Sequence, residues 1–300
     1  MTVHPSYKGI LYMLLAALGF SIMGGAAKSL KGSFGAGHLV FWRNAIGLIA
    51  LLPTLLIKPP VQKGGKLPRL IFRGLMGTIA LYTLLYCILH IPLGTAMSYN
   101  LTSALFIAIF SYFLFGEFHG KRVLFAVLLG FAGMLLIYKP IMHFPWYYHL
   151  TGLISGIVSA IAYLTLGRLA GYYDPRVIVL SFLLSGFLLP LISMAIHYST
   201  GIAADGLFII DWRWPEGREW LSMAVLGLAA LFGQYFVTKA YGADKAGIVS
   251  SIGYANIVFS VFIGMYLGDA FPDWMSLTGI FCIISSGIII SLVKRKAVAS

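Results

Sequence analysis

Charged residues are scarce in this sequence of 300 residues, and acidic ones are the scarcest. Charged side chains make up 10% of the chain and hydrophobic ones 60%, whereas about a quarter of the residues in soluble domains are charged. All nine acids lie at the ends of apolar segments or between them, and none precedes Glu117. This composition excludes a soluble domain and indicates an integral membrane protein. It also argues against a carboxylate proton relay inside the membrane and against a strongly cationic ligand.

Catalytic and cofactor-binding motifs are missing as well. The sequence has no HExxH, GxSxG, Walker A or GxGxxG pattern, so we expect no enzyme activity, no cofactor and no metal site. Cys87 and Cys282 both lie in apolar segments and indicate small core residues rather than a disulfide. The net charge is +12, but the basic residues separate apolar segments instead of forming a patch, so we expect no nucleic acid partner.

Ten apolar segments, bounded by charge, Gly or Pro, are long enough to cross a lipid bilayer. They span residues 8–28, 37–57, 70–89, 93–115, 122–138, 150–170, 177–197, 219–241, 246–268 and 274–293. We expect each to form one helix, and the first to be retained because it lacks a signal cleavage site. The longest connection, 198–217, carries Trp212 and Trp214 and indicates a loop anchored at the membrane interface.

The basic residues predict the orientation. If the N-terminus is cytoplasmic, 15 of the 21 Lys and Arg residues fall on the inner side, Arg73 among them, and six on the outer side. Cytoplasmic loops carry the excess of Lys and Arg, so we expect both termini in the cytoplasm.

The sequence contains an internal repeat: the stretch 94–117 resembles the stretch 246–269, which lies 152 residues further along the chain. Each has a polar first half, an apolar second half, and a Gly followed by an acid. Shifts of 143 and 137 align the first and second apolar segments of the two halves. Five helices per half require the second half to be inverted in the membrane. We therefore expect an all-α membrane domain, 1–300, made of a first repeat, 1–140, and an inverted repeat, 145–297, around a midplane site.

Polar side chains recur at helical spacing along several segments, although lipid offers them no partner. The third segment, for example, carries Thr78, Tyr82, Tyr86 and His90, each four residues apart. Such stripes either line a polar cavity or serve packing, with Ser and Thr bonding to their own helix and Tyr lying at the headgroups. The predicted substrate-binding residues are Arg43, Tyr82, Tyr86, His90, Tyr99, Asn100, Tyr163, Gln234, Tyr254 and Asn256.

Arg43 is the most informative single charge. It lies about six residues into the second segment, and the first 116 residues contain no acid to pair with it. It therefore either extends to the outer membrane interface or faces water, carbonyls or an anionic ligand group.

The segment FWRNAIGLIALLP at 41–53 resembles the arginine-bearing second helix of the EamA-type branch of the drug/metabolite transporter superfamily. The helix ends LFGE and YLGD, followed by VLLGFAG and TGIFCIISSGIII, extend this resemblance over the whole chain. It implies ten helices in two inverted repeats, with helices one, three, four, six, eight and nine around a central cavity. Family helices four and nine often carry Pro where this chain has Ala104 and Asn256, which makes Asn256 a candidate contact.

Two functions follow as hypotheses. The first is a secondary transporter, not driven by ATP, that moves a small zwitterionic or anionic metabolite, amino-acid-like or nucleoside-like, by alternating access. The second is a lipid-linked substrate flippase or an accessory membrane subunit without carrier activity, which predicts a lateral groove and a membrane-exposed basic pocket. The resemblance implies a bacterial inner (plasma) membrane, and the sequence leaves a homodimer open.

Overall fold

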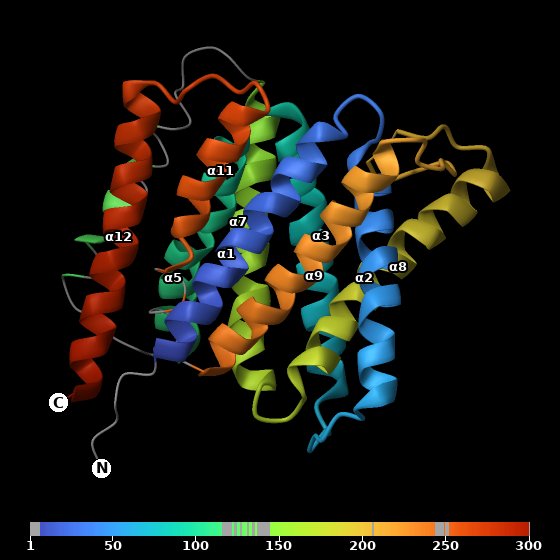
Figure 1. Cartoon of the computed structure of the whole chain (residues 1–300). Helices are drawn as coiled ribbons and strands as arrows, with labels where there is room; N and C mark the ends of the chain where they lie inside the picture. The colour runs from blue at the N-terminus through green and yellow to red at the C-terminus, as the bar shows by residue number, and fades with distance from the viewer. Residues whose placement is uncertain are drawn as a thin grey trace.

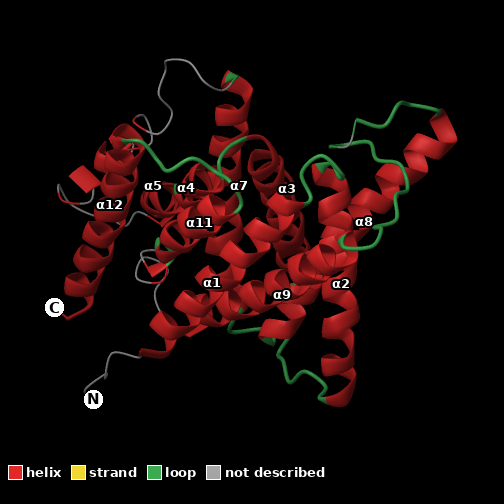
Figure 2. Ribbon diagram, turned by 45° about the horizontal axis from the view of Figure 1, so that its top comes forward, coloured by secondary structure: helices red, strands yellow, loops and turns green. Residues whose placement is uncertain are grey.

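The computed structural model describes residues 7–115, 145–205, 207–243 and 252–299, together with 122, 125–126, 128–130, 132–133, 136 and 249. In this part of the chain the secondary structure is entirely helical (Figure 2). The helices of the first half are α1 Tyr7–Ser29, α2 Ala36–Ile57, α3 Leu67–His90, α4 Leu93–Leu101 and α5 Ser103–Phe115. Those of the second half are α7 Trp146–Leu169, α8 Pro175–Thr200, α9 Glu219–Ala243, α11 Ala255–Tyr266 and α12 Trp274–Ala299.

Six of the described helices have the length and apolar composition needed to cross a membrane: α1, α2, α3, α7, α8 and α9. They confirm six of the predicted helices, and α12 confirms that a helix begins at residue 274. Helix α11 and the part of α12 from Trp274 to Ser286 are shorter apolar helices. The chain is an integral membrane protein.

The prediction of one continuous helix over 93–115 was wrong, because the helix is interrupted at Thr102. The Thr102 backbone N–H donates to the Tyr99 carbonyl three residues back, at 3.1 Å, and its hydroxyl donates to the same carbonyl at 2.6 Å. This tight turn replaces a regular α-helical bond and separates α4 from α5. A threonine therefore breaks this helix, at a point where the sequence has no proline.

The predicted helix 246–268 is described only in part. Its regular portion, α11, begins at Ala255 after a turn at Gly253 and Tyr254, while 244–248, 250 and 251 lie outside the described residues. Most of the predicted fifth helix, 122–138, lies outside them as well.

The helices form one bundle whose two halves are packed against each other. Helix α1 packs along α9, α3 along α7 and α2 along α8, so every one of these contacts joins the first half to the second (Figure 1). Helices α4 and α11 also touch each other near the centre. In Figure 1, α1 and α7 run in opposite directions, and α1 begins at the same end of the bundle at which α12 ends. A large apolar core, which includes Leu39, Leu85 and Leu226, joins these helices.

The loop after α8 folds back over the start of α2, and its tryptophans pack on that helix. Trp212 and Trp214 lie 5.8 and 5.4 Å from the Trp42 ring, and the Trp42 indole donates to the Arg213 carbonyl at 3.1 Å. At the opposite end of α2, the loop between α2 and α3 lies beside the loop between α7 and α8. The Gly64 N–H of the first loop donates to the Tyr172 carbonyl of the second at 2.9 Å. The two ends of the bundle are therefore distinct, one rich in tryptophan and the other in Lys and Arg.

Candidate functional site

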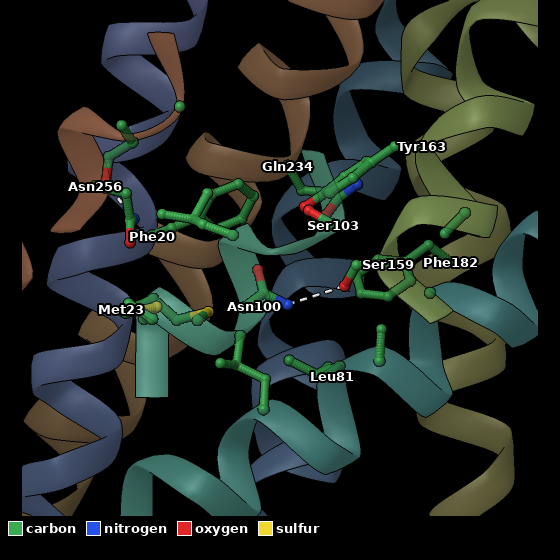
Figure 3. Close-up of a pocket in the computed structure, with 18 of the residues that line it drawn as sticks. Phe20, Met23, Leu81, Asn100, Ser103, Ser159, Tyr163, Phe182, Gln234 and Asn256 are labelled. Carbon is green, nitrogen blue, oxygen red and sulfur yellow. Dashed lines mark hydrogen bonds between the residues drawn. The ribbon is translucent and has the colours of Figure 1, made fainter. Parts of the chain in front are cut away.

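A cavity of about 80 Å³ lies in the bundle and is lined from both halves of the chain. Its wall comes from α1, α3, α4, α5, α7, α9 and α11, with Arg43 added from α2 and Phe182 from α8 (Figure 3). The volume suffices for several water molecules, since one needs roughly 10 to 15 Å³. The polar lining residues are Arg43, Arg73, Asn100, Ser103, Ser159, Tyr163, Gln234, Tyr241 and Asn256. A partly apolar wall with a few convergent polar groups suits an organic solute.

Arg43 belongs to this cavity and not to the membrane interface. Its side chain is 1% exposed, and the guanidinium carbon lies 4.8 Å from the centre of the Phe182 ring. One hydrogen bond, from Nη1 to Asn44 Oδ1 at 2.7 Å, holds it in place, while Nε has no hydrogen-bond partner among the described residues. Asn44 is neutral, so the positive charge has no counter-charge there. A buried, uncompensated cation is unfavourable by several kcal/mol, and an incoming anion relieves that cost.

Arg73 is a second buried arginine in the same wall, and the sequence analysis missed it. It was counted only among the basic residues of the inner side, whereas its side chain is buried in the bundle, 2% exposed, with its guanidinium carbon 5.2 Å from the centre of the same Phe182 ring. Its Nε and Nη1 atoms have no hydrogen-bond partner in the described part of the chain. The only signal in the sequence was its place four residues before Gly77 and eight before Leu81, because residues at this spacing lie on one face of a helix and both of those are buried.

The three amides of the cavity have different roles. The Asn100 amide donates to Ser159 at 2.9 Å (Figure 3) and to Ser155 at 3.0 Å, which ties α4 to α7. The Asn256 amide donates to the Ala17 carbonyl at 2.9 Å and ties α11 to α1. By contrast, the Gln234 amide nitrogen is buried and finds no acceptor among the described residues. It is therefore a third free donor, beside the two arginines.

Five of the ten predicted site residues line the cavity. These five are Arg43, Asn100, Tyr163, Gln234 and Asn256. They come from α2, α4, α7, α9 and α11, so the structure brings together residues up to 213 positions apart in the sequence. Tyr163 stacks on Tyr241 with ring centres 5.1 Å apart, which makes a flat aromatic wall beside the polar groups.

The other five lie outside the cavity lining. His90 stacks on Tyr148 at the end of α3, Tyr86 packs against the same ring at a tilt, and Tyr82 lies on the same side of that helix. The α3 residues that do line the cavity are Arg73, Gly77, Ala80, Leu81 and Leu84. They follow helical spacing on a different face, which is why the tyrosine stripe points elsewhere.

Tyr99 and Tyr254 are buried in the helix packing beside the cavity. The Tyr99 hydroxyl lies 2.7 Å from His149 Nδ1, and its ring lies against Gly152 of α7. The Tyr254 hydroxyl is buried without a partner among the described residues, at the turn before α11. Both flank the two helix interruptions, so they shape the cavity from behind its lining.

The chemistry of the site is that of a donor-rich pocket. The free groups are Arg43 Nε, Arg73 Nε and Nη1, and the Gln234 amide, all of them hydrogen-bond donors. No Asp or Glu occurs among the described lining residues. Donors of this kind bind carboxylate or phosphate oxygens with charge-assisted hydrogen bonds.

Comparison with known proteins places this architecture among transporters. The profile of the EamA-like transporter family matches residues 7–139. An uncharacterized transporter of Helicobacter pylori is 32% identical over 95% of this chain and 94% of its own length. A pseudopaline exporter of Pseudomonas aeruginosa is 29% identical over 96% of this chain and 97% of its own. A solved crystal structure with 20% identity covers 98% of this chain and 99% of its own, with a TM-score of 0.68, and shows the same fold.

Proposed function

The chain belongs to the EamA-like transporter family, and we propose that this membrane transporter carries a small anionic or zwitterionic metabolite through the cavity around Arg43. Membership of a transporter family makes it a carrier of small molecules and not an enzyme. The names of the relatives describe what those proteins carry. For this chain, the chemical class of the substrate is inferred from the residues that line its cavity.

One observation carries this proposal: the Arg43 guanidinium is buried in the cavity, and no described residue of the cavity lining is acidic. Its only hydrogen bond within the described residues is to the neutral Asn44 side chain. A substrate carboxylate would supply the missing charge and the missing acceptor, whereas a cationic substrate would be repelled. The apolar wall and the Tyr163–Tyr241 stack would hold the rest of the molecule.

The same burial speaks against the flippase hypothesis. A flippase for a lipid-linked substrate would need its basic groups on a groove open to the bilayer. Arg43 and Arg73 are instead 1% and 2% exposed and lie against Phe182 within the bundle.

We also propose that residues 1–140 and 145–297 are inverted repeats that rock around the cavity. The packing of α1 on α9 has its counterpart in that of α3 on α7, as a two-fold relation requires. The interruptions at Thr102 and Tyr254 are 152 residues apart, the same shift that aligns the repeated sequences. Interrupted helices at the interface of two such repeats are common in secondary transporters that work by alternating access.

The first prediction tests the chemical class of the substrate. In a thermal-shift screen of the purified full chain, small carboxylates and amino acids should raise the melting temperature, and their uncharged amides should not. The reason is linkage: a ligand that binds the folded state stabilises it in proportion to RT ln(1 + [L]/Kd). If amides and carboxylates were equally stabilising, or only cationic compounds were, the proposed substrate class would be wrong.

The second prediction concerns topology. We propose that the lysine-rich end, with Lys66 and Arg176, faces the cytoplasm and that the tryptophan-rich loop 201–218 faces outward. After replacement of Cys87 and Cys282, the variants Lys63→Cys and Ala204→Cys place single thiols in exposed loops at opposite ends. An impermeant thiol reagent added to intact cells should label the second variant only.

Labelling of both positions only after the cells are opened would contradict the outward placement of the loop. Labelling of Lys63→Cys alone in intact cells would reverse the orientation. The chain with Cys87 and Cys282 replaced and no cysteine added serves as the unlabelled control.

A further inference from the structure

We propose that Arg73 is a second anion-binding residue and that the substrate is a small organic dianion with two carboxylates. This inference rests on the proposed function and narrows it. It follows from two buried arginines, from α2 and α3, that share one cavity and one aromatic neighbour.

The two guanidinium groups are held so that donor groups remain free. Both guanidinium carbons lie close to the Phe182 ring, at 4.8 and 5.2 Å from its centre. Contact with an aromatic ring orients a guanidinium but accepts none of its in-plane N–H bonds in the way that an oxygen does. Nε of Arg43, and Nε and Nη1 of Arg73, accordingly stay without acceptors in the described structure.

Gly77 makes room for the Arg73 side chain. A Cβ atom at this position would lie 2.3 Å from Arg73 Nη1 and 2.7 Å from the Phe182 ring, both far below normal contact distances. A larger residue here would therefore force the guanidinium or the Phe182 ring to shift, and the glycine lets the arginine reach the cavity in the position observed. Arg73 packs over this glycine, is 2% exposed and has no anionic partner among the described residues of the cavity lining. A bound ligand would supply that partner.

The charge balance decides between a singly and a doubly charged substrate. Two cations line the cavity, and no described lining residue is acidic. A monoanion would leave one guanidinium uncompensated, whereas a dianion would neutralise both. Because the free donors belong to two side chains on two helices, two separate carboxylates fit better than one compact group such as a phosphate monoester. Gln234, with its unpaired amide nitrogen, would donate to an oxygen of the same ligand.

The test measures binding of matched acids to the full chain by calorimetry. The probes are succinate, glutarate and adipate, the monoamide of each, and glycerol phosphate. The variants are Arg73→Gln, Arg73→Lys and, as a matched control on the same helix, Arg69→Gln, which alters an exposed arginine one turn away.

We expect the unmodified protein to bind at least one diacid about 10-fold or more tighter than its monoamide. Arg73→Gln should weaken binding of that diacid about 10- to 100-fold, as expected for the loss of one charge-assisted contact, and change monoamide binding by less than about threefold. Arg73→Lys should retain part of the preference because the charge survives, and Arg69→Gln should retain all of it.

The outcomes separate this inference from the proposed function. If monoamides bind as tightly as diacids, or Arg73→Gln weakens both equally, the substrate does not need a second carboxylate. The proposal that the protein transports a carboxylate would then still hold. If glycerol phosphate binds and the diacids do not, the site takes a compact dianion and the two-carboxylate assignment falls. If no acid binds at all, the proposed function fails with it. Should Arg73→Gln not fold, Gly77→Ala keeps the arginine but displaces its guanidinium, and an unchanged diacid preference in that variant would overturn the inference.

Discussion

Arg43→Gln is expected to weaken binding of the acidic substrate about 10- to 100-fold and to leave binding of its uncharged amide unchanged. A charge-assisted contact is worth about 1.5 to 3 kcal/mol, and about 1.4 kcal/mol corresponds to a factor of ten in affinity. The effect should be this large because Arg43 is buried, so that little water screens its charge. Arg43→Lys should retain part of the affinity, since the charge remains and the planar fork is lost. Equilibrium binding of the acid and the amide to each purified variant measures the difference.

A matched control for this experiment is Arg213→Gln. Arg213 also lies over an aromatic ring, that of Phe34 at 4.9 Å, but it is exposed in the loop between α8 and α9 and is not among the residues that line the cavity. It should leave both affinities unchanged. If Arg43→Gln weakened the acid and the amide to the same extent, or neither of them, Arg43 would be a packing residue and the preference for anions would lose its main support.

The positions of the long helices were predictable because hydrophobic length is a strong and local signal. In a bilayer, segments such as 37–57 and 150–170 must form helices, because only a helix pairs all of their backbone N–H and C=O groups within the segment. The interruption at Thr102 was not predictable in the same way. It depends on a hydroxyl that bonds back to the Tyr99 carbonyl, and most Ser and Thr residues in membrane helices do this without breaking the helix.

The candidate site was half predictable for a related reason. Isolated polar groups far from helix ends, such as Arg43 and Gln234, are unfavourable in lipid and therefore point to an interior position. Arg73 was hidden because it follows the exposed Arg69 closely and was counted with the other basic residues of the inner side. The tyrosine stripe of α3 was placed on one face correctly, but periodicity does not say which neighbour that face meets. Tyr86 meets Tyr148 of α7 instead of the cavity.

Asn256 shows how a departure from a family pattern can be explained by contacts. It stands where helices of the EamA-type branch often carry proline, and its amide donates to the Ala17 carbonyl of α1 at 2.9 Å. Ser260 extends the link, since its hydroxyl donates to Ser21 at 3.1 Å. The side chain therefore binds α11 to α1 at the edge of the cavity, a role that a proline could not take.

Gly156→Ala is expected to lower the melting temperature of the protein and to impair transport. Gly156 lies on α7 where that helix crosses the interruption between α4 and α5. A Cβ atom there would lie 2.2 Å from the Thr102 hydroxyl and 2.9 Å from the Tyr99 carbonyl oxygen, which belongs to the backbone and cannot rotate away. The methyl group would therefore push α7 from α4 and strain the hydrogen bonds from Asn100 to Ser155 and Ser159. Overpacking of this kind costs about 1 to 3 kcal/mol.

Gly167→Ala on the same helix is the control that separates crowding from helix propensity. Among the described residues, a Cβ atom at Gly167 would meet only the Tyr241 carbonyl oxygen, at 3.8 Å, an ordinary contact distance. Alanine is the better helix former by about 0.5 to 1 kcal/mol, so this variant should melt at or above the temperature of the unmodified protein. Gly156→Ala should melt below it and lose affinity for the substrate, because Asn100 lines the cavity. If both variants melted alike, α7 would have room to shift at Gly156, and the close approach of α7 to Thr102 would not fix the geometry of the cavity.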